Sequence, residues 1–337
     1  MEKMSEQAPI DASITIGPEP PCMISNSEKH SRKRLPRAIA HRGYRAEYPE
    51  NTMAAFAGAI EVGAHAIETD IHLSRDDVVV LSHDATLKRC FGLPDKISDC
   101  DWSHLSTLRT VHEPRSPMPR LLDLLEYLTK PGLEEIWILL DIKLDNPSDD
   151  VMRLIAHTIA SVLPAPGGKP WSQRVVLGAW AAKYVPLAQQ YLPGFPITHI
   201  GFSLSYARQF LSVPGVSFNM LLPVLMGPGG DKFVREVRRA RRPLIAWTVN
   251  SAEKMGWCVR RGLDGVITDD PKLFLEVCKK HSDDEAEGTE GEKALSWICW
   301  FDVVRVWLFL ALFSALYRRR LGRLDNPKVS VKYGDDA

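Results

Sequence analysis

The sequence of 337 residues has no excess of charge of either sign. Lysine plus arginine number 42, and aspartate plus glutamate also number 42. A chain with no net charge has no general electrostatic attraction for nucleic acid, so composition gives no reason to expect a nucleic-acid partner. If the protein binds phosphate, the binding must come from a local arrangement of cationic side chains.

Cysteine is scarce and follows no pattern. The six cysteines form no Cys-x-x-Cys pair and have no regular spacing, which argues against a zinc site and against a disulfide framework. Residues 1–22 contain acids and prolines where a secretion signal would have basic residues followed by an apolar run. We therefore expect an intracellular protein in a reducing compartment.

An uninterrupted hydrophobic run of membrane-spanning length is also missing. Residues 294–320 are rich in apolar side chains, but Asp302 and Arg305 interrupt them, and the unbroken part covers only residues 306–317. Three tryptophans and the following RRRLGR are typical of an anchor at the depth of lipid headgroups. We expect this segment to associate with a mitochondrial, endoplasmic reticulum or lipid-droplet membrane; the alternative is an amphipathic helix buried on the exterior of the main domain.

What the chain does have is a regular alternation of short apolar runs and helical patterns over residues 38–280. If VVVLSHD is counted as an extension of the second unit, eight strand–helix units span about 240 residues, which predicts an α/β fold of the TIM-type (β/α)8 barrel class. A doubly wound sheet is the competing fold. The flanking segments are predicted to be a disordered polar tail (1–37), an acidic linker (281–293) and a second polar tail (321–337).

Charged side chains occur in pairs at the ends of two predicted strands. Glu68 and Asp70 lie two residues apart in AIETDIHL, so both point to one face of the strand. Asp141 and Lys143 have the same spacing at the end of IWILLDIK. Neighbouring carboxylates repel one another unless a cation lies between them, and hard oxygen ligands suit Mg²⁺ or Ca²⁺. Since charge at the end of a buried strand is unusual, these pairs indicate a metal site rather than solvated acids.

Histidines end two further predicted strands. His41 and Arg42 follow the first strand, and His83 and Asp84 end VVVLSHD. Two imidazoles on either side of a phosphorus atom can act as general acid and general base, and arginine can grip phosphate oxygens. A single histidine at a strand end is more often merely hydrogen-bonded, so the residues alone leave this role open.

Six motifs in order give the sequence a resemblance to the glycerophosphodiester phosphodiesterase family: HRGYRAEYPENT, ETD, SHD, LDIK, WTVN and GVITDDP. The resemblance covers residues 38–271 and implies a metal-dependent phosphodiester hydrolase on a TIM barrel. It implies the metal ligands Glu68, Asp70 and Asp141 and the acid/base pair His41 and His83. It also implies a group of residues that bind the phosphate or the substrate or support the same mouth: Arg42, Glu50, Lys143, Trp247 and Asn250.

One departure from the family concerns Asp141, because many members have glutamate at this position. The shorter side chain makes Asp141 the least certain of the three ligands. Trp180 is a weaker candidate than Trp247 for the wall of the substrate site. We interpret His72 as a polar lining residue and His65 as structural.

Within the family, the sequence bears a closer resemblance to the fungal phosphatidylglycerol-specific phospholipase C. The features that support this are YPENT, LDIK with aspartate, the WTVN and GVITDDP motifs and the hydrophobic segment after a polar linker. The resemblance implies cleavage of phosphatidylglycerol to diacylglycerol and glycerol phosphate, by attack of the headgroup 2-hydroxyl on phosphorus. Hydrolysis of deacylated, soluble glycerophosphodiesters and a non-catalytic lipid-binding barrel remain the alternatives.

Overall fold

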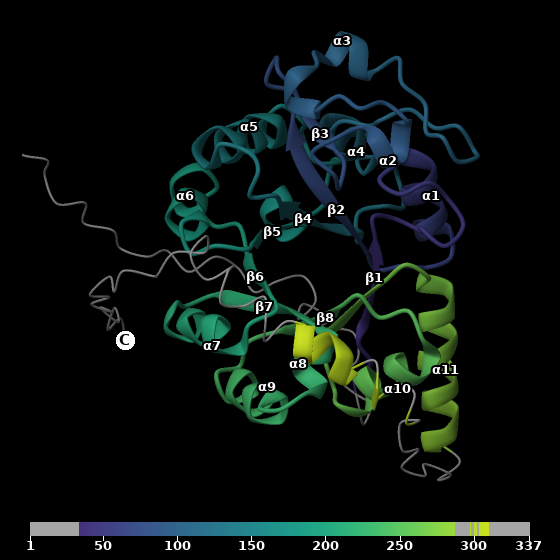
Figure 1. Cartoon of the computed structure of the whole chain (residues 1–337), viewed down its shortest axis with the longest axis vertical. Helices are drawn as coiled ribbons and strands as arrows, with labels where there is room; N and C mark the ends of the chain where they lie inside the picture. The colour runs from purple at the N-terminus through teal and green to yellow at the C-terminus, as the bar shows by residue number, and fades with distance from the viewer. Residues whose placement is uncertain (1–33, 287–296, 298–299, 302, 310–337) are drawn as a thin grey trace, which may run out of the picture.

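The structure is a computed structural model, and it describes residues 34–286, 297, 300–301 and 303–309. Eight parallel strands form a closed barrel with helices around its outside (Figure 1). Pairing of the first strand with both the second and the last parallel strand closes the sheet. The parallel strands are β1 (Arg37–His41), β2 (Ala66–Leu73), β4 (Trp137–Ile142), β5 (Val175–Ala179), β6 (Ile197–Gly201), β7 (Val216–Leu221), β8 (Leu244–Trp247) and β9 (Gly265–Thr268). The predicted TIM-type fold is confirmed.

A ninth strand, β3 (Val79–Leu81), lies outside the barrel cycle. It pairs antiparallel with the end of β2, where Leu73 lies opposite Val79. This confirms that VVVLSHD extends the second unit. Because the hairpin folds back along β2, the residues that follow β3 return to the same end of the barrel as the metal-ligand candidates.

Helices surround the barrel, except for two that belong to an excursion with its own small core (Figure 1). The helices are α1 (Met53–Glu61), α2 (Lys88–Phe91), α3 (Trp102–Leu105), α4 (Leu121–Tyr127), α5 (Ser148–Ala160), α6 (Tyr184–Tyr191), α7 (Leu204–Ala207), α8 (Leu222–Met226), α9 (Gly230–Arg239), α10 (Ala252–Arg260) and α11 (Pro271–Ala286). Of these, α2 and α3 belong to the excursion, which lies between β3 and α4. Helix α1 begins after Thr52, whose hydroxyl accepts a hydrogen bond from the Ala55 N–H at 3.2 Å. It buries Phe56 completely, and truncating such a side chain to alanine costs about 3–5 kcal/mol of stability.

Side-chain alternation along each strand separates two cores. On β2, Ile67 and Ile71 belong to the large core between the sheet and the helices, whereas Ala66 belongs to the small core inside the barrel. Glu68 and Asp70 share the inward face of Ala66, because residues two apart on a strand point the same way. The interior of the barrel is therefore apolar at its amino-terminal end and charged where the strands end.

The described residues place the predicted boundaries as follows. β1 begins at Arg37, and α11 continues to Ala286, so it includes the beginning of the segment predicted to be a linker. The remainder of that linker, residues 1–33 and residues 321–337 lie outside the described part of the chain. No helix among the described residues has both the length and the apolarity needed to cross a membrane.

The described part of the predicted anchor packs against the barrel. Val303 is buried in the main core, and the Trp307 ring lies so close to Gly227 that its Cδ1 would be 3.1 Å from a Cβ added there. Gly227 ends α8, which directly follows β7 at the carboxyl end of the barrel. One side of the segment is thus attached to the domain, as in the buried-helix alternative, while several of its large apolar side chains remain exposed.

Candidate active site

The carboxyl ends of three neighbouring strands bring the predicted site residues together. On β1 and β2, His41 lies opposite Glu68, and on β2 and β4, Asp70 lies opposite Asp141. Lys143 follows Asp141 on the same face of the chain. Because the side-chain parity is the same on all three strands, these groups converge on the mouth of the barrel.

Three carboxylates form an acidic cluster at this mouth. One oxygen each of Glu68, Asp70 and Asp141 lies within 4.8 Å of the others, and all three residues are buried. Burial and the charges of Asp70 and Asp141 raise the pKa of Glu68 well above its ordinary value. Three buried oxygen donors that repel one another suit a hard divalent cation, so the residues present fit the metal that the sequence predicted.

Two cations border the acidic cluster. The Lys143 ammonium lies 2.7 Å from Asp70 Oδ1 and 2.6 Å from Asp141 Oδ2, and Arg42 Nε lies 3.3 Å from Asp70 Oδ2. Although burial alone would raise it, the charges of Lys143 and Arg42 lower the pKa of Asp70. Burial likewise opposes the charge on Lys143, but Asp141 and Asp70 raise the pKa of Lys143. Both cations therefore remain charged beside the place where a phosphate would sit.

Each predicted acid/base histidine is held by a carboxylate. His41 Nδ1 lies 2.6 Å from Asp269 Oδ1, and His83 Nδ1 lies 2.7 Å from Asp84 Oδ1. A carboxylate at Nδ1 keeps the proton there and leaves Nε2 as the nitrogen for proton transfer. Burial and the nearby Lys143 charge lower the pKa of His83.

The backbone around Arg42 adopts a conformation that is unusual for residues with a side chain. Arg42 has φ 58° and the following Gly43 has φ 83°. A Cβ on Gly43 would lie 2.7 Å from backbone and side-chain atoms of Ala55, so only glycine fits this turn. The turn directs the Arg42 N–H toward Glu68, whose backbone oxygen accepts at 2.8 Å and whose Oε2 lies at 3.1 Å. Strain of this kind is typical of functional sites.

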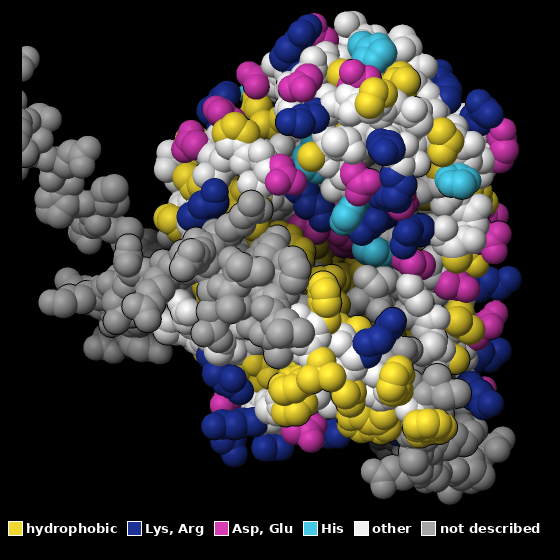
Figure 2. Space-filling model, in the orientation of Figure 1, with side chains coloured by type: hydrophobic (Ala, Val, Ile, Leu, Met, Phe, Trp, Pro, Cys, Tyr) yellow, Lys and Arg dark blue, Asp and Glu magenta, His cyan; other side chains and the backbone are white. Residues whose placement is uncertain are grey.

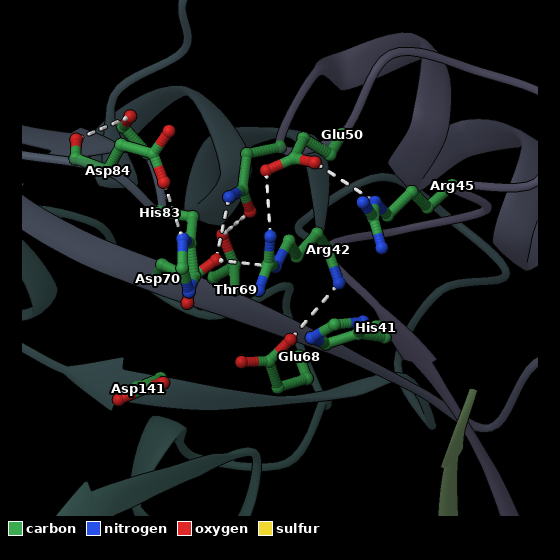
Figure 3. A network of polar contacts seen from close by, with 12 residues as sticks. His41, Arg42, Arg45, Glu50, Glu68, Thr69, Asp70, His83, Asp84 and Asp141 are labelled. Atoms are coloured by element: carbon green, nitrogen blue, oxygen red, sulfur yellow. Dashed lines mark hydrogen bonds and ion pairs between the residues drawn. The ribbon is translucent and has the colours of Figure 1, made fainter. Parts of the chain in front are cut away.

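Glu50 lies among three arginines rather than beside the acidic cluster, and Figure 3 shows two of them, Arg42 and Arg45. Its carboxylate accepts hydrogen bonds from Arg42 at 2.9 Å, Arg45 at 3.0 Å and Arg89 at 2.7 Å. Burial opposes its ionisation, but the Arg89 hydrogen bonds and the three charges lower the pKa of Glu50 to about 2. Because an ionised carboxylate repels phosphate, we do not expect Glu50 to contact the phosphate itself. Its hydrogen bonds instead orient Arg42 and the other arginines at the rim of the mouth.

The opposite side of the mouth is aromatic. Trp180 packs edge-on against Trp247 with ring centroids 5.5 Å apart, and Phe202 lies 6.4 Å from Trp180. The Trp180 indole N–H also donates to Asp141 Oδ1 at 2.6 Å. Figure 2 shows a hollow on this face with histidine and charged side chains above it and hydrophobic side chains in and below it. The mouth therefore has a charged side and an apolar side.

Comparison with known proteins identifies this arrangement. A family model described as "Glycerophosphoryl diester phosphodiesterase family" matches residues 41–273. The chain belongs to the glycerophosphoryl diester phosphodiesterase family.

The chain is also similar to individual proteins. The chain is 28% identical to the uncharacterized protein YqiK of Bacillus subtilis over 73% of this chain and 99% of that protein. It is 46% identical to lysophospholipase D GDPD1 of Rattus norvegicus, over only 23% of this chain and 25% of that protein. Among solved structures, a phosphodiesterase of Oleispira antarctica in complex with the product sn-glycerol-3-phosphate has 18% identity and a TM-score of 0.61, covering 73% of this chain and 97% of that one.

As a member of the glycerophosphoryl diester phosphodiesterase family, the protein is a phosphoric diester hydrolase. The acid cluster, the two histidines and the phosphate-binding candidates that the sequence predicted all meet at one mouth in the structure. Trp247 and Trp180 form its apolar side, and Trp247 donates to the Asn219 carbonyl oxygen at 3.0 Å. Asn250 contacts Asp269, not the acid cluster: its side chain donates to Asp269 Oδ2 at 2.7 Å and accepts from the Asp269 N–H at 2.9 Å.

The family's PENT motif supplies a residue that sequence reasoning missed. Asn51, with φ 52°, donates to Asp70 Oδ2 at 2.8 Å and accepts from the Thr69 hydroxyl at 2.8 Å. It therefore fixes the orientation of one metal-ligand candidate. The two histidines predicted to have no catalytic role contact the backbone: His65 Nδ1 accepts from the Ala38 N–H, and the His72 ring contacts the His83 carbonyl oxygen.

Proposed function

We propose that this phosphodiesterase cleaves phosphatidylglycerol in the manner of a phospholipase C, releasing diacylglycerol and glycerol phosphate. The observation that carries the proposal is the two-sided mouth, in which buried charges face an apolar wall made by Trp180, Phe202 and Trp247. A phosphodiester with two polar arms has no apolar group that would pack against this wall. The first methylenes of a lipid can pack against indole faces, whereas the phosphate and the glycerol headgroup suit the charged side.

The phosphate would be held by Arg42 and Lys143, both of which remain charged in the buried mouth. Glu68, Asp70 and Asp141 would hold Mg²⁺ or Ca²⁺, which lowers the pKa of a nearby hydroxyl and offsets charge on phosphoryl oxygens. Glu50 keeps Arg42 in place, and Asn51 does the same for Asp70. Rigid charges aimed at a transferring phosphoryl group contribute several kcal/mol to such reactions.

The histidines would move the protons. The 2-hydroxyl of the headgroup attacks phosphorus and gives its proton to Nε2 of one histidine, while the bond from phosphorus to the diacylglycerol oxygen breaks. The other histidine protonates that leaving oxygen, and water then opens the cyclic phosphate with the two roles exchanged. His41 and His83 are equivalent in one respect, since each has a carboxylate at Nδ1.

The C-terminal segment supports a membrane-bound substrate. Among the described residues, eight large hydrophobic side chains are exposed, and six of them belong to this segment: Trp297, Trp300, Phe301, Val304, Leu308 and Phe309. The segment packs on the end of α8, near the carboxyl end of the barrel, through Trp307. Inserting these side chains into the headgroup region of an intracellular membrane would hold the mouth close to lipid.

A second candidate shares the same chemistry. Lysophospholipids and deacylated glycerophosphodiesters also carry a free hydroxyl next to the phosphate, and a short part of the chain is 46% identical to a protein named lysophospholipase D. In those substrates the attacking hydroxyl belongs to the glycerol that keeps the phosphate. The shared requirement is a hydroxyl adjacent to the phosphodiester, so substrate choice depends on which arm the apolar wall holds.

Phosphorus NMR of the full chain with Mg²⁺ or Ca²⁺ tests the proposal against three substrates. Vesicles of phosphatidylglycerol should yield a water-soluble phosphomonoester, while diacyl phosphatidylcholine, which has no adjacent hydroxyl, should remain intact. Turnover of glycerophosphocholine alone would show that the substrate is a deacylated, soluble diester and not a lipid. Formation of a phosphomonoester from none of the three would favour a lipid-binding barrel.

A further inference from the structure

The amino-terminal end of the barrel, opposite the catalytic mouth, contains a cavity of about 340 Å³. It lies among the segments that lead into β1, β2, β4 and β5, and none of the catalytic or metal-ligand candidates lines it. Its charged lining residues are Arg37, Glu135, Lys169 and Arg174, and His65 lies beside them. Three cations thus face one carboxylate, and that carboxylate already pairs with Lys169 at 2.5 Å.

Arg174 is the unusual member of this group, because its side chain is almost completely buried and forms no salt bridge with a carboxylate in the described part of the chain. Its relative exposure is 1%, and its three hydrogen bonds all go to backbone oxygens, those of Leu128, Leu133 and Ile136. Its Nη1 has no hydrogen-bond partner among the described residues. The ring of Trp171 stacks at 4.9 Å from the guanidinium carbon, which excludes water from one face.

A buried cation without an anion carries a large desolvation cost. The three carbonyl groups and the more distant charges of Glu134 and Glu135 offset part of that cost, but Nη1 remains without a hydrogen-bond partner among the described residues. Arg37 and Lys169 add positive charge at the same cavity instead of removing it. An anion in the cavity would supply negative charge and a hydrogen-bond acceptor for Nη1. A planar guanidinium beside an ammonium is a common arrangement for phosphate recognition.

We propose that this cavity binds a small phosphate-bearing molecule through Arg37, Lys169 and Arg174. The cavity has room for inorganic phosphate or a small phosphomonoester. Binding would connect the loop before β4 with the loop before β5, because Arg174 already ties these two segments together. The site is separate from the proposed phosphodiesterase reaction, so either can fail without the other.

Thermal unfolding of the full chain in EDTA, with and without inorganic phosphate, tests the proposal. At phosphate ten times above its Kd, the Tm should rise by about 4 °C. The double variant Arg37→Gln, Lys169→Gln should lose this rise. The matched control Lys232→Gln, Arg239→Gln removes two exposed cations from α9 and should keep it, as should Lys143→Met in the catalytic mouth.

The result that overturns the proposal is an equal rise in the full chain and in the Arg37→Gln, Lys169→Gln variant, or no rise in any protein. Loss of the rise only in Lys143→Met would place the anion in the catalytic mouth and also overturn it. If the double variant fails to fold, the rate of Lys169 acylation in the unaltered protein, measured by mass spectrometry, tests the site instead. Phosphate should slow this acylation several-fold, and an unchanged rate refutes the site. A larger effect of glycerol 3-phosphate would assign a phosphomonoester, and an equal effect the phosphate group alone.

Discussion

The Lys143 ammonium lies 2.7 Å from Asp70 Oδ1, so a lysine occupies the space beside an oxygen that would bind the metal. The same ammonium lies 2.6 Å from Asp141 Oδ2. A divalent cation that binds both oxygens must displace this ammonium and then experience its repulsion. Lys143 therefore bridges Asp70 and Asp141, and a metal held by these carboxylates would leave its ammonium free to contact the phosphate.

Lys143→Met should tighten binding of Ca²⁺ or Mg²⁺ by about tenfold or more, because a unit charge a few ångströms from the ion is removed. Isothermal titration calorimetry measures this directly, and Lys143→Arg, which retains the charge, is the control. The variant should nevertheless lose activity, since it lacks a phosphate contact. Weaker metal binding in Lys143→Met would mean that Lys143 organises the site without competing for it.

His41→Ala and His83→Ala should each lower kcat/KM by about 10²–10⁴ while the circular dichroism spectrum stays unchanged. The loss follows because one proton transfer in each step would lack its side chain. Activity close to that of the unaltered protein in either variant would contradict the acid/base assignment.

Asp84→Asn should have a smaller effect with a characteristic pH dependence. Asp84 Oδ1 contacts His83 Nδ1 at 2.7 Å and favours the protonated imidazole, whereas burial and Lys143 lower the pKa of His83. Without the carboxylate the pKa of His83 falls further, so the limb of the pH–rate profile that reports this histidine should move to lower pH. An unshifted profile with reduced kcat would indicate only a structural role for Asp84.

Side-chain parity made much of the site predictable. Glu68 with Asp70, and Asp141 with Lys143, share a strand face whatever the tertiary structure, and the barrel fold then places them at one mouth. The partners that lie far away in the chain could not be found in this way. Asp269 reaches His41 across 228 residues only because β9 closes the barrel against β1.

Short-range backbone geometry explains why the sequence did not predict the role of Asn51. Asn51 contacts Asp70 because a turn with positive φ directs its side chain inward, and the letters PENT alone do not show that direction. Glu50 was predicted to support the mouth, and the structure shows how: through Arg42, Arg45 and Arg89.

Glu50→Gln should reduce the free energy of unfolding at neutral pH. It should also make this free energy fall less as the pH is lowered. The pKa of Glu50 is lowered to about 2 in the folded protein, so its ionisation stabilises the fold above an unfolded pKa near 4.5, and this contribution disappears as the pH falls from about 4.5 toward 2. The shift corresponds to at most about 3 kcal/mol. Urea unfolding at pH 7 and pH 3 should show a smaller difference for the variant, and an equal difference would contradict the assignment.

Phe301→Ser combined with Leu308→Ser should weaken binding to anionic vesicles about tenfold or more, because two exposed apolar side chains no longer enter the headgroup region. Sedimentation with vesicles measures the bound fraction. Val111→Ser with Leu163→Ser, which removes the two exposed apolar side chains outside the segment, is the matched control. Equal sedimentation of both variants would show that membranes are bound elsewhere.

The most direct test of the proposed reaction uses a phosphatidylglycerol analogue whose headgroup lacks the 2-hydroxyl. The proposed attack on phosphorus needs that hydroxyl, while the charged and apolar sides of the mouth would bind the analogue as well as the natural lipid. Phosphorus NMR should show cleavage of phosphatidylglycerol and none of the analogue at the same enzyme and metal concentrations. Cleavage of both lipids at similar rates would contradict the account.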